Sequence, residues 1–141
     1  MKWYSALSIA LILVGCANQN KMAKSTGSPD LIKTASGLQY TILKKGDGPA
    51  AKAGQEVLIF ETTTYLNGTV LYSNENTNNP VKVLIGGNQA TEGVDEGLRG
   101  MQTGEIRKLV VPPYLAKRKF YPDNLSPDST LAIKIILHKI L

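Results

Sequence analysis

Residues 91–101, with the sequence TEGVDEGLRGM, decide the fold of this 141-residue chain. Thr91 belongs to the residue types that cap the N-terminus of a helix, and the acidic side chains that follow it suit the positive end of the helix dipole. Gly100 or Gly104 stands where a glycine commonly ends a helix. The stretch therefore predicts a short helix from Thr91 through Leu98.

Strand patterns lie on both sides of this helix. They combine β-branched and aromatic residues with alternating polarity, and Gly or Pro ends several of them. The predicted strands are residues 37–43, 57–66, 69–72, 81–85, 106–111 and 130–141. Because the connections are short and no period repeats, we expect an antiparallel sheet wrapped around the helix.

The pair Asn67-Gly68 separates two of these strands. Asn-Gly between apolar runs is a strong signal for a two-residue hairpin in a type I′ turn, which needs positive φ at both residues. Asn67-Gly68-Thr69 also matches a glycosylation sequon, which we interpret as the turn alone.

The N-terminus has the pattern of a targeting signal. A short basic start precedes an apolar run at residues 6–14, which is well below the roughly 20 residues of a membrane-spanning helix. The run ends in Leu13-Val14-Gly15-Cys16, which resembles the bacterial lipobox. We expect a lipoprotein signal peptide at residues 1–15 and lipidation of Cys16; the alternative is an ordinary secretory signal.

A polar segment without periodicity follows, and it predicts a flexible tether over residues 16–34, with the folded domain at 35–141. In the bacterial lipoproteins that the N-terminus resembles, the absence of Asp after the lipidated Cys is compatible with transport to the outer membrane. We therefore expect a domain in the bacterial cell envelope, lipid-anchored to the outer membrane and facing the periplasm.

Composition excludes several classes of function. With one Cys and one His, the chain cannot form a disulfide framework or a Cys/His zinc site. The single His, His138, lies in an apolar run, which does not suit a catalytic triad. The net charge is +5, but basic residues are scattered except at Lys117-Arg118-Lys119, so no nucleic-acid partner is expected. That run is either a solvated loop or a contact for an anionic lipid surface or acidic partner.

The order of short motifs is similar to one family. The motifs are Ser36-Gly37-Leu38-Gln39-Tyr40, Gly46-Asp47-Gly48, Ala53-Gly54, Asn67-Gly68-Thr69-Val70, residues 93–101 with Gly104, Leu109-Val110-Val111-Pro112-Pro113 and Ser129-Thr130-Leu131. They resemble, in register over residues 35–141, the bacterial FKBP-type peptidyl-prolyl cis-trans isomerases. The resemblance implies an α+β fold, in which a five-stranded antiparallel half-barrel curls around one short helix.

The same resemblance implies an activity that needs few polar residues. Rotation about an Xaa-Pro bond crosses a barrier of about 20 kcal/mol that arises from amide resonance, and a pocket that strips water from the amide weakens that resonance. No catalytic nucleophile, metal or cofactor is implied. The implied partners are proline-containing polypeptides, and we expect a monomer.

The family's pocket positions carry other residues here. Its strand Tyr falls on Glu61, its Phe-Asp pair on Leu71 and Tyr72, its next Phe on Val81, its Val-Ile pair on Ala90 and Thr91, its floor Trp on Val94, its flap Tyr on Lys117 and its last Phe on Ile133. No family aromatic remains at its own position. The aliphatic replacements are also what an ordinary core contains.

One exchange suggests compensation. In the family the strand Tyr bonds the Asp that follows the hairpin, whereas here the acid is Glu61 and the phenol is Tyr72. We expect a hydrogen bond between them, with Lys117 as the competing partner of Glu61. Phe120 and Tyr121 either bend over the pocket or anchor their loop.

Two functions remain open at this point. One is an isomerase of weak activity that acts on Xaa-Pro bonds of exported chains. The other is a membrane-anchored binding or assembly module that keeps the fold without the reaction.

Overall fold

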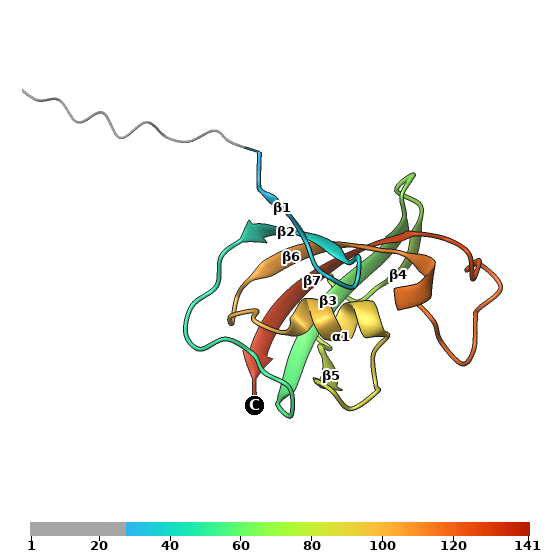
Figure 1. Cartoon of the computed structure of the whole chain (residues 1–141). Coiled ribbons are helices and arrows are strands. Elements are labelled where there is room, and N and C mark those ends of the chain that lie inside the picture. The colour runs from blue at the N-terminus through green and yellow to red at the C-terminus, as the bar shows by residue number, and fades with distance from the viewer. Residues whose placement is uncertain (1–27) are drawn as a thin grey trace, which may run out of the picture.

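The computed structural model describes residues 28–141, which form one antiparallel sheet and one α-helix (Figure 1). The elements are β1 (Leu31–Lys33), β2 (Gln39–Lys44), β3 (Glu56–Tyr65), β4 (Val70–Ser73), β5 (Val81–Leu84), α1 (Glu92–Leu98), β6 (Ile106–Val111), the 3-10 helix η1 (Pro113–Leu115) and β7 (Leu131–Ile140). The strand order is β1-β2-β6-β7-β3-β4, and β5 also pairs with β3. The expected α+β half-barrel around a short helix is confirmed.

The strand count differs from the expected five, because the sheet has seven strands. Strands β4 and β5 share one edge of β3, with Thr62–Thr64 opposite β4 and Glu56–Ile59 opposite β5. The polar loop that connects β4 to β5 separates the two strands along this edge of β3. Strand β1 pairs with β2 through Leu31–Lys33, so the ordered domain begins before residue 35, where the sequence placed its start.

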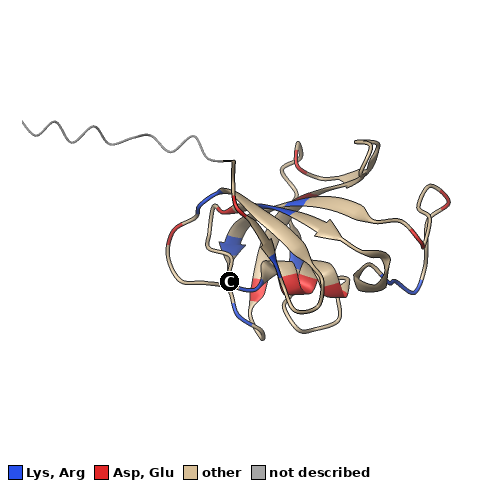
Figure 2. Cartoon of the chain, turned by 45° about the horizontal axis from the view of Figure 1, so that its top comes forward, with Lys and Arg blue, Asp and Glu red and all other residues tan. Residues whose placement is uncertain are grey.

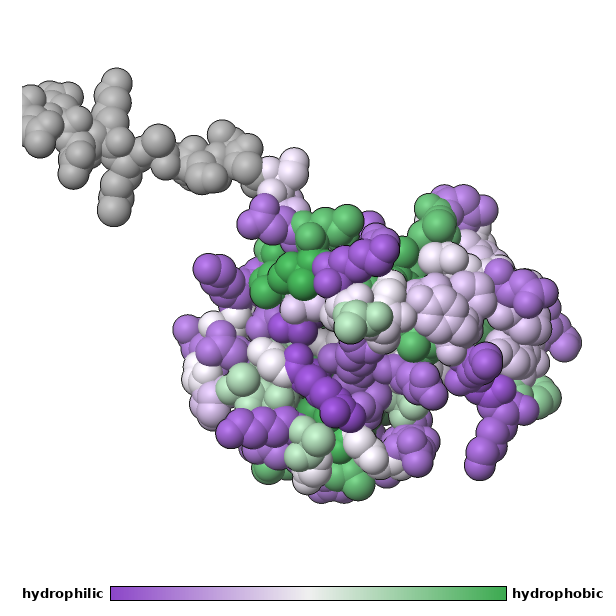
Figure 3. All heavy atoms as spheres, viewed as in Figure 1, coloured by the Kyte–Doolittle hydropathy of each residue, from purple (hydrophilic) through white to green (hydrophobic). Residues whose placement is uncertain are grey.

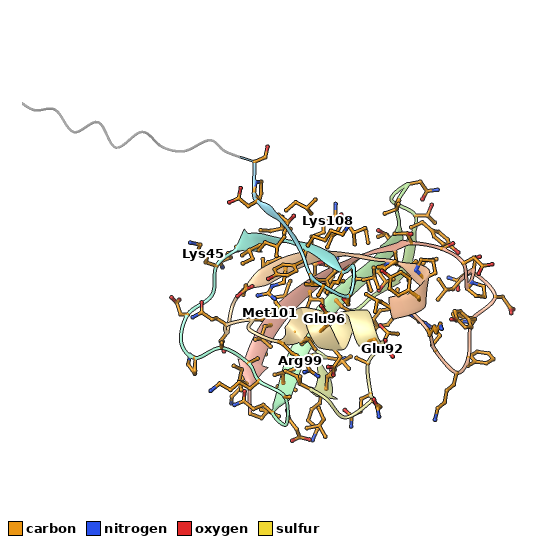
Figure 4. The ribbon with its side chains drawn as sticks, viewed as in Figure 1. Lys45, Glu92, Glu96, Arg99, Met101 and Lys108 are labelled. Carbon is orange, nitrogen blue, oxygen red and sulfur yellow. The ribbon has the colours of Figure 1, made fainter. Side chains whose placement is uncertain are left out.

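Helix α1 packs very closely on β6, and two glycines make this possible. A Cβ atom on Gly97 would lie 2.5 Å from Cδ1 of Leu109, and one on Gly93 would lie 2.5 Å from Cγ1 of Val111. Leu98 and Leu109 are completely buried in this contact. The polar side of the helix faces outward, as Figure 2 shows by its acidic residues and Figure 4 by Glu92 and Glu96.

The helix has the expected bounds but not the expected cap. Thr91 occupies the N-cap position, yet its side chain makes no capping hydrogen bond. Its Oγ1 atom is buried and has no hydrogen-bond partner within the described residues. At the other end Arg99 is the C-cap, and Gly100 follows with φ of 80°.

The Asn67-Gly68 hairpin is confirmed, but the type I′ turn is wrong. Only Gly68 of the pair has positive φ, at 91°. Gly68 N–H donates to Tyr65 O (3.0 Å) and Tyr65 N–H donates to Thr69 O (2.9 Å), which is the pattern of a longer loop with a glycine bulge. The Asn67 side-chain oxygen accepts from Thr69 N–H (3.0 Å), and Asn67 itself does not have positive φ.

The predicted signal peptide, the lipidation of Cys16 and most of the tether lie outside the described residues. In the described part of the chain, no helix is long and apolar enough to cross a membrane.

Candidate functional site

A cavity of about 410 Å³ lies between β3, β5, the start of α1 and the loop that follows η1. Its lining includes most of the pocket residues predicted from the sequence, namely Glu61, Tyr72, Val81, Ala90, Thr91, Val94 and Ile133. The structure therefore brings residues from five elements and one connection to one concave site. Their role in substrate binding stays a prediction.

Two predicted pocket residues do not line this cavity. Leu71 packs against the core, because it neighbours Tyr72 on β4 and adjacent strand residues point to opposite sides. Lys117 lines an adjoining cavity, and the next residue, Arg118, takes the place expected for it. Both basic residues are exposed and lie in the loop that follows η1 (Pro113–Leu115).

The cavity also contains residues that the sequence analysis missed. Ile59 and Thr63 flank Glu61 at two-residue spacing on β3, and Val83 follows Val81 in the same way on β5. The two-residue period of a strand is the signal that would have found all three. Gln89 gave no such signal, because it lies in the irregular connection before α1.

Glu61 is the one acidic side chain in this cavity, and few donors satisfy it. Its carboxylate Oε1 accepts a long hydrogen bond of 3.5 Å from the Thr63 hydroxyl. Burial raises the pKa of Glu61, while the charge of Arg118 and the Thr63 hydroxyl lower it; burial is the largest effect, so the pKa is raised from 4.5. A titratable group shifted in this way inside a cleft marks a candidate functional site.

The expected hydrogen bond between Glu61 and Tyr72 is wrong. The pairing of β3 with β4 sets Tyr72 opposite Thr63, and Tyr72 is 47% exposed. Glu61 instead lies beside Asn74, whose Oδ1 accepts from the Glu61 N–H at 2.7 Å. Lys117 as the competing partner is also wrong, because the cation that acts on Glu61 is Arg118.

Of the two roles proposed for Phe120 and Tyr121, Phe120 borders the pocket and Tyr121 anchors the loop. Phe120 lines the cavity while 78% exposed, so it stands at the entrance. Tyr121 is half-buried against the core, and its hydroxyl accepts from Arg118 N–H at 3.4 Å. The loop is thus anchored by one aromatic residue and presents the other to the cavity.

We predict that Glu61→Gln removes a pH dependence of stability. The raised pKa means that the folded chain binds more protons than the unfolded chain, so the free energy of unfolding falls as pH rises from 4.5 through the raised pKa. The favourable contribution is complete below 4.5 and lost above the folded pKa. Urea midpoints of both proteins between about pH 4 and about pH 8 should converge at low pH and separate at high pH, with Glu61→Gln the more stable.

Glu92→Gln is the control, since it removes one exposed carboxylate from the same region. Parallel midpoint curves for wild type and Glu61→Gln across the whole pH range would contradict this reading of the site.

The side chains that line the cavity can bind a ligand by apolar contacts and hydrogen bonds. They are not arranged as a catalytic nucleophile or a metal site. Six of its lining residues are aliphatic and two are aromatic, and the others supply one carboxylate, one guanidinium, two threonine hydroxyls and a side-chain amide. No group of three His, Cys, Asp or Glu side chains within residues 28–141 is placed to hold a metal ion.

A half-barrel closed on one side by a short helix, with a cavity beside the helix start, defines an FKBP-like domain. The family model for FKBP-type peptidyl-prolyl cis-trans isomerases matches residues 48–138, and the chain belongs to this family. The expectation from the sequence motifs is confirmed.

Relatives and solved structures agree with this assignment. The chain is 33% identical to the peptidyl-prolyl cis-trans isomerase Fkbp12 of Drosophila melanogaster, over 74% of this chain and 98% of that protein. It is 35% identical to the isomerase Mip of Chlamydia pneumoniae, over 71% and 37% respectively. The crystal structure of FkpA from Escherichia coli has a TM-score of 0.69 and 28% identity, covering 85% of this chain and 54% of that one. Two further curated relatives are longer than this chain: the match covers 26% of the 46 kDa FK506-binding nuclear protein of Spodoptera frugiperda and 40% of the chloroplastic isomerase FKBP19 of Arabidopsis thaliana.

Proposed function

We propose that this protein is a lipid-anchored prolyl isomerase of weak activity, which binds Xaa-Pro segments of exported polypeptides in the cavity that contains Glu61. The observation that carries the proposal is the cavity itself. It lies beside the start of α1 in a chain of this family, and residues from β3, β5, α1 and β7 converge on it. Matched relatives are named peptidyl-prolyl cis-trans isomerases.

The cavity walls explain why weak activity is expected. Val81, Val94 and Ile133 stand where the family resemblance places aromatic rings. An aromatic contact contributes about 0.5–1.5 kcal/mol beyond its buried area, and a tenfold change in rate needs only about 1.4 kcal/mol. The aliphatic walls still exclude water from one side of a prolyl ring, so the reaction is slowed rather than abolished.

The test is a direct rate measurement. The full chain in mild detergent, assayed on an Ala-Leu-Pro-Phe peptide by protease coupling or by NMR exchange, should accelerate isomerisation at least about tenfold less than Drosophila Fkbp12. Fkbp12 measured in the same detergent is the control. A rate equal to that of Fkbp12 would refute the claim of weak activity.

The second candidate is a binding module without catalysis, favoured by the carboxylate in the cavity. The Glu61 carboxylate in the cavity lining prefers water or a hydrogen-bond donor, so it makes a poor surface for removing water from an amide. Peptide-induced NMR shifts at Thr91 and Val94 without any acceleration would establish this function instead.

The anchor is argued from the sequence. Leu13-Val14-Gly15-Cys16 ends the apolar run, and the only Cys of the chain lies there. Residues 17–30, fully extended, reach about 50 Å from a lipidated Cys16 to the start of β1. This spacing holds the domain in water near the membrane. The absence of Asp after Cys16 supports an outer-membrane location that faces the periplasm.

A further inference from the structure

A second cavity, of about 550 Å³, adjoins the one that contains Glu61. The two share Gln89, Ala90, Thr91 and Arg118, so they form one continuous concave surface. The second cavity adds Lys117 and Lys119, which stand on either side of the shared Arg118 in the loop after η1. We call these three consecutive cations the basic rim. The region around α1 and this loop is largely hydrophilic in Figure 3.

No residue of the basic rim forms an ion pair within the described part of the protein. The ion pairs among residues 28–141 engage Lys82, Arg99, Arg107 and Lys134, and none involves a rim residue. All three rim residues are exposed. Arg118 acts on Glu61, which leaves two lysines opposed within their cavity by the single carboxylate of Glu92.

One hydrogen bond links the rim to a residue that packs against the core. In this bond, Arg118 N–H donates to the hydroxyl of Tyr121. The 3-10 helix η1 leads directly into the rim. A group of cations that borders a cavity raises the local concentration of anionic ligands there.

We infer that the basic rim makes this protein select polypeptides in which acidic residues flank the Xaa-Pro bond. The inference rests on the proposed function, because it requires the peptide to occupy the cavity of Glu61. A polypeptide is favoured over an anionic lipid surface because the cations border a concavity. Sequence-readable lipid-binding clusters moreover use about 4–8 basic residues on an open surface.

Three peptides with the same Ala-Leu-Pro-Phe core test this, with Glu, Ser or Lys residues flanking the core on both sides. They are titrated at low salt into the 15N-labelled full chain in non-ionic detergent, and the amides of Thr91 and Val94 report binding. The Glu-flanked peptide should bind at least about tenfold more tightly than the Lys-flanked one, and about 0.5 M salt should reduce the difference.

The variant Lys117→Glu/Lys119→Glu should reverse this preference. The matched control is Lys44→Glu/Lys45→Glu, which makes the same change in net charge at exposed residues that line neither cavity. Figure 4 shows Lys45 at the left edge of the molecule, away from Glu92 at the right-hand end of α1. The control should keep the preference for the Glu-flanked peptide.

The other outcomes separate the inference from the proposed function. Equal affinity for the three peptides would overturn the inference and leave the proposed function standing. Absence of shifts at Thr91 and Val94 with every peptide would overturn both. If Lys117→Glu/Lys119→Glu weakens binding to phosphatidylglycerol vesicles and leaves the peptide preference unchanged, the rim serves a lipid surface and the inference is wrong.

Discussion

Arg107→Met is expected to lower the free energy of unfolding by about 3–5 kcal/mol, because it strands a buried carboxylate. The Arg107 side chain is 5% exposed and that of its partner Glu105 is 4% exposed. Arg107 Nε lies 2.8 Å and Nη2 lies 2.7 Å from Glu105 Oε1. Urea or guanidinium midpoints of the two proteins measure the loss.

Further contacts explain the size of this effect. Arg107 Nη1 donates to the carbonyl oxygens of Gly97 (3.0 Å) and Arg99 (3.2 Å) at the end of α1, and its guanidinium lies 4.4 Å from the centre of the Tyr40 ring. Methionine keeps much of the volume but supplies none of these donors. The substitution therefore also removes the hydrogen bonds that tie β6 to the C-terminal end of α1, the end away from the candidate site.

Two comparison proteins test the cause of this loss. Arg99→Met breaks the ion pair with Asp95, in which the Arg99 side chain is 51% exposed, and should change stability by less than about 1 kcal/mol. Arg107→Met/Glu105→Met removes both buried charges and should be more stable than Arg107→Met alone. Glu105→Met is measured as well. If the loss of stability in the double variant equals the sum of the losses in Arg107→Met and Glu105→Met, the two side chains act independently.

Cys16→Ser is expected to move the protein from the membrane fraction to the soluble fraction. The anchor proposed from Leu13-Val14-Gly15-Cys16 depends on a single thiol, and the chain contains no other Cys. Each buried methylene of an acyl chain contributes about 0.8 kcal/mol to membrane binding, so several chains on one residue account for nearly all of the attachment. Fractionation of cells that express each form, with labelled palmitate, measures the effect.

Asn18→Ser is the matched control, since it makes a small polar change close to the proposed modification site. It should remain in the membrane fraction and incorporate label. The anchor hypothesis is wrong if Cys16→Ser still fractionates with membranes and palmitate never enters the wild-type protein.

Local patterns were sufficient for most of the secondary structure. The alternation over residues 106–111 and 130–141 placed β6 and β7 within a residue of their observed bounds. The pattern of acids and glycines in residues 91–101 placed α1. Strand β1 escaped notice because it has only 3 residues and depends on pairing with β2 for its conformation.

Only part of the candidate site could be predicted from the sequence. Positions carried over from the family motifs identified Glu61, Val94 and Ile133 as neighbours in one cavity. They failed for the pair of Glu61 and Tyr72, because a bulge in β4 and the pairing of Tyr72 with Thr63 set the register there. Register depends on the hairpin as a whole, and the Asn67-Gly68 signal does not specify which loop length forms.

The sequence by itself thus determined the element types, the family and the residues available to the cavity, because period, turn chemistry and motif order are properties of neighbouring residues. The tertiary structure alone decided that Arg118 rather than Lys117 acts on Glu61, and that Phe120 stands at the entrance. It also decided that Arg107 ties β6 to the end of α1. Each of these contacts joins segments through the packing of the whole sheet around the helix, and no local pattern encodes that packing.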